Sequence, residues 1–461
     1  MSELPAGWSH FSLRDVGGLT GGKTPSKATA AFWSSRDVPW VSPKDMKRSR
    51  LEDAEDRISQ VAVAEAGMTL YPADSVLMVT RSGILQHTFP VALAGTELTV
   101  NQDIKVLRPV EGITPRFAFY LLKGFGGKIL SVCSKDGTTV QSIDSEKLEA
   151  FPLPMPPTAE QTRIVDKLDE LLAKVDALKA RIDGLPALLK RFRQSVLAAA
   201  VSGQLTEDWR AKNVAKIGAE GSAAETQDEF AWPVVRLGDV ALDFSYGSSA
   251  KSKPAGDIPV LRMGNIQGGR LAWDDLVFSS NPEEIKKYSL QVGDVLFNRT
   301  NSPELVGKTA TYKGERPAIY AGYLIRVRCS ERLAPDFLNH CLNSPQGRDY
   351  CWQVKTDGVS QSNINAKKLA NFRFGLPSTE EQIEIVRCVD QLFSFAEQLE
   401  AKVNEARTRI DRLTQSILAK AFRGELVSQA PEDEPASILL ERIRAQRAAV
   451  PRSRRGRKAL A

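Results

Sequence analysis

Two stretches of the chain carry apolar residues at alternating intervals of four and three, with no gap in either. The first covers residues 164–196 and the second covers residues 385–417. This spacing places one apolar stripe along an α-helix, and a stripe of this kind needs a partner surface. The pattern therefore predicts two long helices, over residues 158–205 and 378–426.

The two helical stretches are copies of one segment, 221 residues apart. The apolar register is kept in both copies, and the flanks match as well, because Glu160-Gln161 recurs as Glu381-Gln382. Two core helices of a bundle are an alternative, but the strict register in both copies favours long helices that act as a rod. The repeat predicts two similar modules held apart by this rod.

Sequence signals mark the ends of both helices. Thr158 and Thr379 each follow a proline-rich segment and precede a glutamine by three residues, which is a capping-box pattern. Gly203 and Gly424 are typical of C-terminal caps. Pro186 falls inside the first apolar pattern, and a proline in a helix interior costs about 3 kcal/mol. We therefore expect a kink or a break at this proline.

The segments before the helices predict two folded modules, at residues 1–157 and 232–377. Short apolar runs are separated by Gly, Pro and Asn, with helical patches between them, as in mixed α/β folds. The modules are degraded repeats of each other, since Trp8 recurs as Trp232. The predicted fold is therefore α+β, with two mixed α/β modules joined by two long helices.

Two further segments lie outside the modules and the helices. Residues 206–231 are polar and rich in Ala, Gly and Glu, which is typical of a linker. In the C-terminal tail, residues 427–461, the stretch 436–444 predicts a short amphipathic helix. The last 20 residues include eight basic and no acidic ones, although the net charge of the whole chain is only +6. We expect this basic end to be disordered and to contact phosphates at most.

The composition is that of a soluble globular protein, with 42% hydrophobic and 26% charged residues. No apolar run reaches the roughly 18 residues of a membrane span, and no export leader is apparent at the N-terminus. The five cysteines form no CxxC pair, and there are three histidines. These features predict a cytoplasmic protein with reduced thiols and no metal site.

One apparent nucleotide-binding motif fails a physical test. Residues 17–24 match the pattern GxxxxGK[ST], but Pro25 follows at once. The pattern binds phosphate when a helix starts at the lysine, and a proline pushes the residue before it away from helical angles. Neither a nucleophile elbow nor a methyltransferase or nuclease signature is apparent in the sequence. We therefore expect the chain to have no catalytic residues.

Several apolar strands are followed directly by Arg, Asn, Thr or Ser, and a polar loop lies near the end of each module, at 135–143 and 356–364. Arginine can bind guanine through two hydrogen bonds, and asparagine can bind adenine in the same way. The alternative is that these residues form turns and satisfy backbone groups. The candidate DNA-binding residues are Lys44, Thr80, Arg81, Ser82, Thr139, Gln141, Arg262, Asn265, Asn298, Arg299, Asn301, Lys308, Ser360, Gln361 and Asn363.

These motifs resemble the specificity (S) subunits of type I restriction–modification systems, over nearly the whole chain. Residues 22–45 are similar to a recurrent opening of the family's target-recognition domains, and residues 262–308 contain motifs of another variant. Pro156-Pro157-x-x-Glu160-Gln161 and Leu376-Pro377-x-x-Glu380-Glu381-Gln382 resemble the signature that enters each conserved helix. The order and the duplication of the motifs make the resemblance specific.

The resemblance implies that the two helices form an antiparallel coiled coil with a recognition domain at each end. Each domain would read one half-site of an asymmetric, bipartite target in double-stranded DNA. The subunit would bind no cofactor, because two methyltransferase (M) subunits would use S-adenosylmethionine and restriction (R) subunits would use ATP and Mg. The candidate residues for docking M subunits are the charged Arg163, Lys167, Glu381 and Glu384.

Two competing functions stay open at this point. A non-catalytic coiled-coil scaffold could carry two modules that bind proteins or glycans rather than DNA. A nuclease is the other alternative, although the sequence contains no convincing acidic cluster for a metal. The Arg, Asn and Ser residues at strand ends favour DNA recognition over both.

Overall fold

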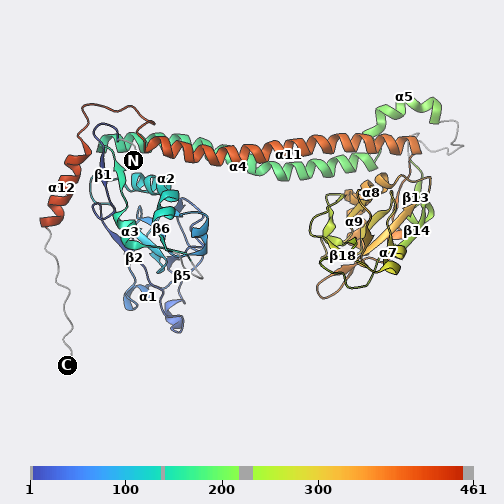
Figure 1. Cartoon of the computed structure of the whole chain (residues 1–461), viewed down its shortest axis with the longest axis horizontal. Helices are drawn as coiled ribbons and strands as arrows, with labels where there is room; N and C mark the ends of the chain where they lie inside the picture. Colours follow the sequence, from blue (N-terminus) through green and yellow to red (C-terminus); the bar gives the residue numbers. More distant parts are fainter. Residues whose placement is uncertain (1–3, 136–140, 218–231, 450–461) are drawn as a thin grey trace. The chain divides into compact units, whose positions relative to one another are not determined.

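The chain folds as two units that each have their own internal contacts. The computed structural model describes residues 4–135, 141–217 and 232–449. The first unit consists of Met1–Ile182 with Ala406–Ala461, and the second unit is Asp183–Glu405. The division falls inside both long helices, so each unit contains one module and a part of each helix (Figure 1).

The first module is a mixed α/β domain. Its elements are β1 Ser9–Phe11, β2 Leu19–Gly21, η1 Ala30–Phe32, β3 Val38–Val41, β4 Arg50–Leu51, β5 Arg57–Ile58, α1 Gln60–Glu65, β6 Val76–Val79, η2 Gly83–Gln86, β7 Val91–Ala94, β8 Thr99–Val100, β9 Ile104–Leu107, α2 Pro115–Cys133, β10 Ser134–Lys135, β11 Ser142–Ile143, α3 Ser145–Ala150 and β12 Leu153–Met155. The main sheet has the order β2-β9-β6-β7-β4, and smaller sheets have the orders β5-β3-β8, β1-β12 and β10-β11.

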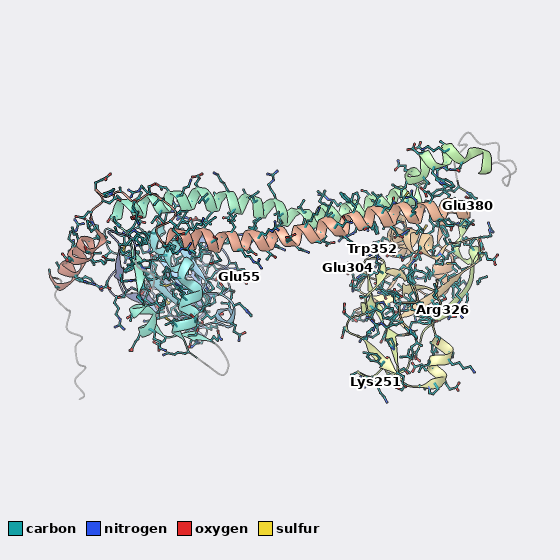
Figure 2. All side chains as sticks on the ribbon, turned by 45° about the horizontal axis from the view of Figure 1, so that its top comes forward. Glu55, Lys251, Glu304, Arg326, Trp352 and Glu380 are labelled. Atoms are coloured by element: carbon teal, nitrogen blue, oxygen red, sulfur yellow. The ribbon has the colours of Figure 1, made fainter. Side chains whose placement is uncertain are left out.

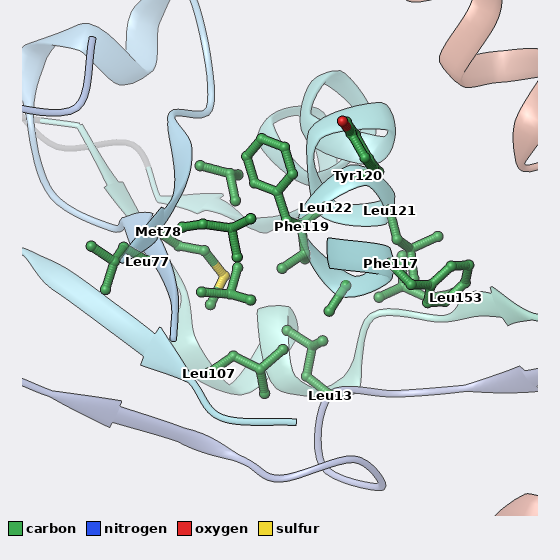
Figure 3. Packing of buried hydrophobic residues seen from close by; sticks show 14 of the residues in the cluster. Leu13, Leu77, Met78, Leu107, Phe117, Phe119, Tyr120, Leu121, Leu122 and Leu153 are labelled. Atoms are coloured by element: carbon green, nitrogen blue, oxygen red, sulfur yellow. The ribbon is translucent and has the colours of Figure 1, made fainter. Parts of the chain in front are cut away.

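The core of the first module is centred on β6, whose four residues are all fully buried. A strand that is covered on both faces has a continuous apolar sequence rather than an alternating one. Helix α2 contributes Phe117 and Phe119 to the same cluster as Met78 of β6, as Figure 3 shows. The apolar run of β6 is therefore explained by its place in the middle of the sheet.

The second module is also a mixed α/β domain. Its elements are β13 Val234–Arg236, α6 Leu237–Val240, β14 Ala241–Tyr246, β15 Ile258–Leu261, η4 Met263–Asn265, β16 Ile266–Gln267, β17 Arg270–Leu271, β18 Val277–Ser279, α7 Pro282–Tyr288, β19 Val295–Asn298, β20 Thr300–Asn301, β21 Thr309–Thr311, β22 Ile319–Tyr320, β23 Leu324–Cys329, α8 Pro335–Asn343, α9 Pro345–Val354, β24 Thr356–Asp357, β25 Ser362–Asn363, α10 Ala366–Ala370 and β26 Arg373–Gly375. Its sheets have the orders β14-β23-β19-β21, β18-β15-β22, β20-β25-β24, β13-β26 and β16-β17.

The two modules share the order of four strands in the main sheet and of three strands in a second sheet. The order β2-β9-β6-β7 in the first module corresponds to β14-β23-β19-β21 in the second. Likewise β5-β3-β8 corresponds to β18-β15-β22, and in both sheets the last pair is parallel. The predicted internal repeat of mixed α/β modules is therefore confirmed at the level of strand order.

The two predicted long helices are present as α4, Thr158–Val201, and α11, Thr379–Ala421. The expected break at Pro186 is wrong, because α4 continues through this residue. Proline removes one backbone hydrogen bond of the helix. Pro186 itself is exposed.

Within each unit the two helices pack against each other in opposite directions. In the first unit, Lys179 pairs with Asp411 at 3.0 Å, and Arg163 pairs with Asp433 beyond the end of α11. In the second unit, Arg193 pairs with Glu400 at 2.9 Å, and Thr206, beyond the end of α4, donates to Glu381 at 2.6 Å. Apolar residues of both helices also enter the core cluster of the module in their own unit.

The helix ends differ in part from the sequence prediction. Gly203 and Gly424 have φ angles of 83° and 75°, as expected for C-terminal caps. The capping boxes at Thr158 and Thr379 are not formed, because both threonines lie inside the helices. At the second helix the cap is Ser378, whose hydroxyl accepts the N–H of residue 381 at 3.3 Å.

Two segments outside the modules contain helices. Within the predicted linker, Glu207–Ile217 forms helix α5, which begins with two acidic residues, as favoured at a helix N-terminus. Residues 218–231 lie outside the described part. The tail contains helix α12, Ala436–Ala449, whose apolar face enters the core of the first module. The predicted amphipathic helix is confirmed, whereas the basic residues 451–458 lie outside the described range.

Candidate nucleic-acid interface

In the second module, the chain that leaves the central strand β19 runs beside the polar loop predicted to bind DNA. Thr300 pairs with Asn363, and Asn301 pairs with Ser362, so β20 and β25 form one antiparallel ladder. The backbone carbonyl of Arg299 accepts the N–H of residue 364 at 2.9 Å. The fold therefore brings together two candidate motifs that are separate in the sequence.

The first module repeats this arrangement at the end of β6. The carbonyl of Thr80 accepts the N–H of Ile143 at 2.8 Å, and the N–H of Ser82 donates to the carbonyl of Gln141 at 3.1 Å. Between them, Arg81 forms an antiparallel bridge with the loop. Each module thus presents a strand-end arginine next to its polar loop.

The strand-end arginine of the second module, Arg299, lies against an aromatic ring. Its guanidinium carbon is 4.7 Å from the ring centroid of Tyr246. Its terminal nitrogens donate at 3.3 Å to the carbonyl of Gly322 and at 3.4 Å to the side chain of Asn363. Both hydrogen bonds are long, so the guanidinium is held mainly by the aromatic ring.

The strand-end arginine of the first module, Arg81, is held by charge. Its Nε is 2.9 Å from a carboxylate oxygen of Asp103. The other carboxylate oxygen of Asp103 accepts the side-chain amide of Asn101 at 3.0 Å. The guanidinium of Arg81 remains largely exposed, so it can still reach a ligand beyond the module surface.

Three of the predicted DNA-binding residues are buried and form hydrogen bonds inside their modules. Asn265 accepts the N–H of residue 262 at 2.9 Å, and its amide donates to two backbone carbonyls of the following turn. The hydroxyl of Thr80 donates to a backbone carbonyl at 3.2 Å, and the amide of Asn298 donates to another at 3.5 Å. For these residues the structure supports the alternative that their polar groups stabilise turns.

Two further basic candidates form ion pairs at the surface. The Nζ of Lys44 is 2.9 Å from Asp56 and 3.2 Å from Glu55, which is labelled in Figure 2. The guanidinium of Arg262 donates at 2.7 Å to the carbonyl of Asp275 and lies 3.2 Å from its carboxylate. Surface pairs of this kind are weak, so a phosphate could compete for either cation.

The remaining candidates have different degrees of exposure. Burial lowers the pKa of Lys308, whose Nζ is 3.4 Å from the side chain of Gln267. Asn301 accepts the N–H of residue 302 at 2.8 Å, and Ser82 accepts the N–H of residue 84 at 3.4 Å. Gln141 is half-buried, Ser360 and Gln361 are exposed, and Thr139 lies outside the described residues.

Sequence reasoning missed three exposed aromatic side chains of the second module. Tyr246 is 42% exposed, Tyr323 is 51% exposed, and Trp352, labelled in Figure 2, is 57% exposed. Tyr323 is adjacent to Arg299, because its carbonyl accepts the N–H of Arg299 at 3.0 Å. Aromatic residues are common in cores, so their exposure could not be read from the sequence pattern.

The candidate docking residues on the helices are less exposed than expected. Glu381 is buried, and its predicted role as an exposed docking charge is wrong. Arg163 pairs with Asp433 at 2.5 Å, while Lys167 and Glu384 form ion pairs with neighbours on their own helices. Of the four residues, Lys167 keeps the largest exposed fraction of its side chain.

The burial of Glu381 results from three hydrogen-bond donors in the second unit. The indole N–H of Trp232 donates to one carboxylate oxygen at 3.0 Å. Thr206 and Arg210 donate to the other oxygen at 2.6 Å and 2.5 Å. In the first unit, the indole N–H of Trp8 donates to the buried Glu160 in the same way, at 3.0 Å.

No group of three or more His, Cys, Asp or Glu side chains in the described residues has the geometry to hold a metal ion. Each cysteine in the described ranges is a free thiol. None of the described helices has an apolar stretch long enough to span a membrane.

Comparison with known proteins identifies the family. A family described as type I restriction modification DNA specificity domain matches residues 5–187 and 230–406. The chain belongs to this family. The specificity subunit of the type I restriction enzyme EcoKI of Escherichia coli (strain K12) is 32% identical over 464 residues, which cover 97% of each chain. The StySPI specificity subunit of Salmonella potsdam is 31% identical over 463 residues, covering 97% of this chain and 96% of that one.

Two solved structures have the same fold. One chain, from a study of complex assembly and conformational transition in the type I R-M system, matches with a TM-score of 0.63. It is 20% identical, and the match covers 92% of this chain and 100% of that chain. The HsdS subunit from Thermoanaerobacter tengcongensis matches with a TM-score of 0.51 and 20% identity, over 92% and 98% of the two chains. The protein is a DNA specificity subunit with two repeated recognition modules.

Proposed function

We propose that this specificity subunit reads an asymmetric, bipartite DNA target, one half-site with each module. The supporting observation is that both modules place a strand-end arginine beside a polar loop, with different neighbours. In the first module Arg81 pairs with Asp103, and in the second Arg299 lies on Tyr246. Modules with the same topology but different surface side chains would read different bases.

The boundaries of the recognition modules in this proposal are residues 1–157 and 232–377. The helices α4 and α11 form an antiparallel coiled coil, a proposal supported by the opposite direction of their contacts within each unit. Exposed charges on these helices, among them Lys167, dock two methyltransferase subunits. Restriction subunits complete the assembly.

The specificity subunit contributes recognition and no catalysis in this proposal. Adenine methylation with S-adenosylmethionine, and cleavage that depends on ATP and Mg, belong to the partner subunits. The described side chains include no metal-binding cluster, but this absence is not the reason for the proposal. It rests on membership of the specificity-subunit family.

Single-molecule methylome sequencing of the source cell tests the proposal, with the gene intact, deleted, and restored. We expect deletion to remove one split N6-methyladenine motif and restoration to return it. As a control, the gene is restored as a hybrid in which residues 232–377 are replaced by the equivalent segment of a relative. This hybrid should change one half-site and keep the other. An unchanged methylome in cells that produce the methyltransferase subunit would contradict the proposal.

A further inference from the structure

The backbone around Arg299 is fixed on both sides. Its N–H donates to the carbonyl of Tyr323 at 3.0 Å, and its carbonyl accepts the N–H of Ile364 at 2.9 Å. It follows directly on β19, whose four residues are all buried. The Cα of Arg299 therefore has little freedom, and the direction of its side chain depends on what the guanidinium contacts.

The ring of Tyr246 lies against this guanidinium. The guanidinium carbon is 4.7 Å from the ring centroid, which is within the range of a cation–π interaction. The backbone of a sheet strand carries the ring, and the Tyr246 hydroxyl also accepts the N–H of Ala366 at 3.0 Å. Tyr246 ends β14, an edge strand of the main sheet. The sheet therefore holds the ring, and the ring holds the plane of the guanidinium.

The hydrogen-bonding capacity of Arg299 is only partly used within the protein. Its two terminal nitrogens donate at 3.3 Å and 3.4 Å, which are long distances for N–H donors. No carboxylate in the described part of the chain forms an ion pair with Arg299, in contrast to Arg81 with Asp103. A ligand with two adjacent acceptors can therefore replace weak bonds without breaking an ion pair.

We propose that Tyr246 is a positioning residue that holds Arg299 for bidentate recognition of a guanine in the half-site of the second module. Guanine presents O6 and N7 as two adjacent acceptors in the major groove, and they match the fork of a guanidinium. The inference rests on the proposed function and adds one residue and one base to it. Tyr246 acts through Arg299, so its ring is needed and its hydroxyl is less so.

The test uses the full methyltransferase complex assembled with variants of this subunit. Initial methylation rates are measured on a DNA library in which each position of the wild-type target is replaced by each other base. Tyr246→Leu removes the ring, and Tyr246→Phe keeps it. Tyr323→Leu is the matched control, because Tyr323 is another exposed tyrosine that contacts Arg299 through its backbone.

We expect Tyr246→Leu to lower the preference for guanine at one position of one half-site by roughly 10- to 100-fold. Tyr246→Phe and Tyr323→Leu should keep that preference. Arg299→Lys keeps the charge but not the fork, and it should relax the same position. The double variant Tyr246→Leu with Arg299→Lys should lose no more than Arg299→Lys alone, since both changes remove one interaction.

Three outcomes would overturn the inference. These are full guanine preference in Tyr246→Leu, equal loss in both half-sites, or relaxation at a base pair other than G·C. If Tyr246→Leu does not fold, Arg299→Lys still decides, since unchanged discrimination by this variant refutes the assignment. Failure of the proposed function is a separate result, because the wild-type complex would then methylate the library without sequence preference.

Discussion

Trp8 and Trp232 stand at equivalent places in the two modules, but the glutamates that accept their indole N–H groups differ in environment. The donor–acceptor distance is 3.0 Å in both units, to Glu160 in the first and to Glu381 in the second. The second oxygen of Glu381 accepts from two more side chains. The second oxygen of Glu160 is buried and has no hydrogen-bond partner among the described residues.

The difference arises in the segments that follow the helix-ending glycines. Three residues after Gly203 comes Thr206, whose hydroxyl donates to Glu381. Three residues after Gly424 comes Val427, which has no donor in its side chain. Both copies of the repeat thus contain the hydrogen bond that joins the module to its helix. The further donors to Glu381, Thr206 and Arg210, have no counterpart at Glu160 in the described part of the chain.

The charge environment of Glu160 adds to this contrast. Burial raises the pKa of its carboxyl above the ordinary value, while the hydrogen bond from Trp8 and the charge of Arg163 lower it. The guanidinium of Arg163 is itself engaged by Asp433, whose negative charge raises the pKa of Glu160 further. Glu160 therefore lacks the direct cation that Arg210 supplies to Glu381.

The largest difference in stability between the two units is expected when each glutamate is replaced by glutamine in turn. Glu381→Gln leaves the guanidinium of Arg210, whose side chain is only 12% exposed, without its carboxylate. Removing one partner of a buried ion pair costs about 3–5 kcal/mol of stability, because the other charge stays buried without compensation. Glu160→Gln breaks no ion pair of this kind, so we expect a change of about 1 kcal/mol or less.

Native-state hydrogen exchange measures this difference, because it reports local opening free energies at the start of each helix. Amides of residues 379–392 should lose protection in Glu381→Gln, and those of residues 158–171 should be nearly unchanged in Glu160→Gln. Each variant serves as the control for the other unit. Equal losses in both units would show that the additional donors to Glu381 contribute little.

The long helices and the repeat could be predicted from sequence because their signal is periodic and duplicated. The buried state of Glu381 could not, because its three donors come from distant segments, Trp232 and residues 206–210. A glutamate next to a heptad stripe has the same sequence signature whether it is solvated or bound to such donors. Tertiary contacts decide between the two states.

The candidate DNA-binding residues show the same limit. Asn265 and Arg299 both follow apolar strands in polar motifs, yet Asn265 stabilises its own turn and Arg299 is directed to an aromatic ring. Asparagine is small enough to bond to the adjacent backbone, whereas arginine extends beyond it. Tyr246 was missed because its partner lies in a distant strand.

Replacing the tryptophans should have a smaller effect on the opening free energy. In this case the first unit should lose more stability than the second. Trp8→Phe removes the hydrogen-bond donor of Glu160, and leaving a buried carboxylate without a donor costs about 1–3 kcal/mol. Trp232→Phe leaves Glu381 bound to Thr206 and Arg210, so we expect about 1 kcal/mol or less. Hydrogen exchange at the same amides measures both values. A larger loss in Trp232→Phe would contradict the comparison.

The smallest expected effect is a pH dependence confined to the first unit. Since the folded-state pKa of Glu160 is raised above the ordinary 4.5, the folded unit binds this proton more tightly than the unfolded chain does. The stabilising contribution of protonated Glu160 is therefore complete below about pH 4.5 and is lost as the pH rises through the folded-state pKa.

Other carboxylates titrate in the same range, so the informative quantity is the difference in opening free energy between wild type and Glu160→Gln. We expect the opening free energy at residues 158–171 to become larger in Glu160→Gln than in wild type as the pH rises above 4.5. A constant difference over that range would mean that Glu160 ionises in the folded unit as freely as in water, and the contrast with Glu381 would then rest on hydrogen bonds alone.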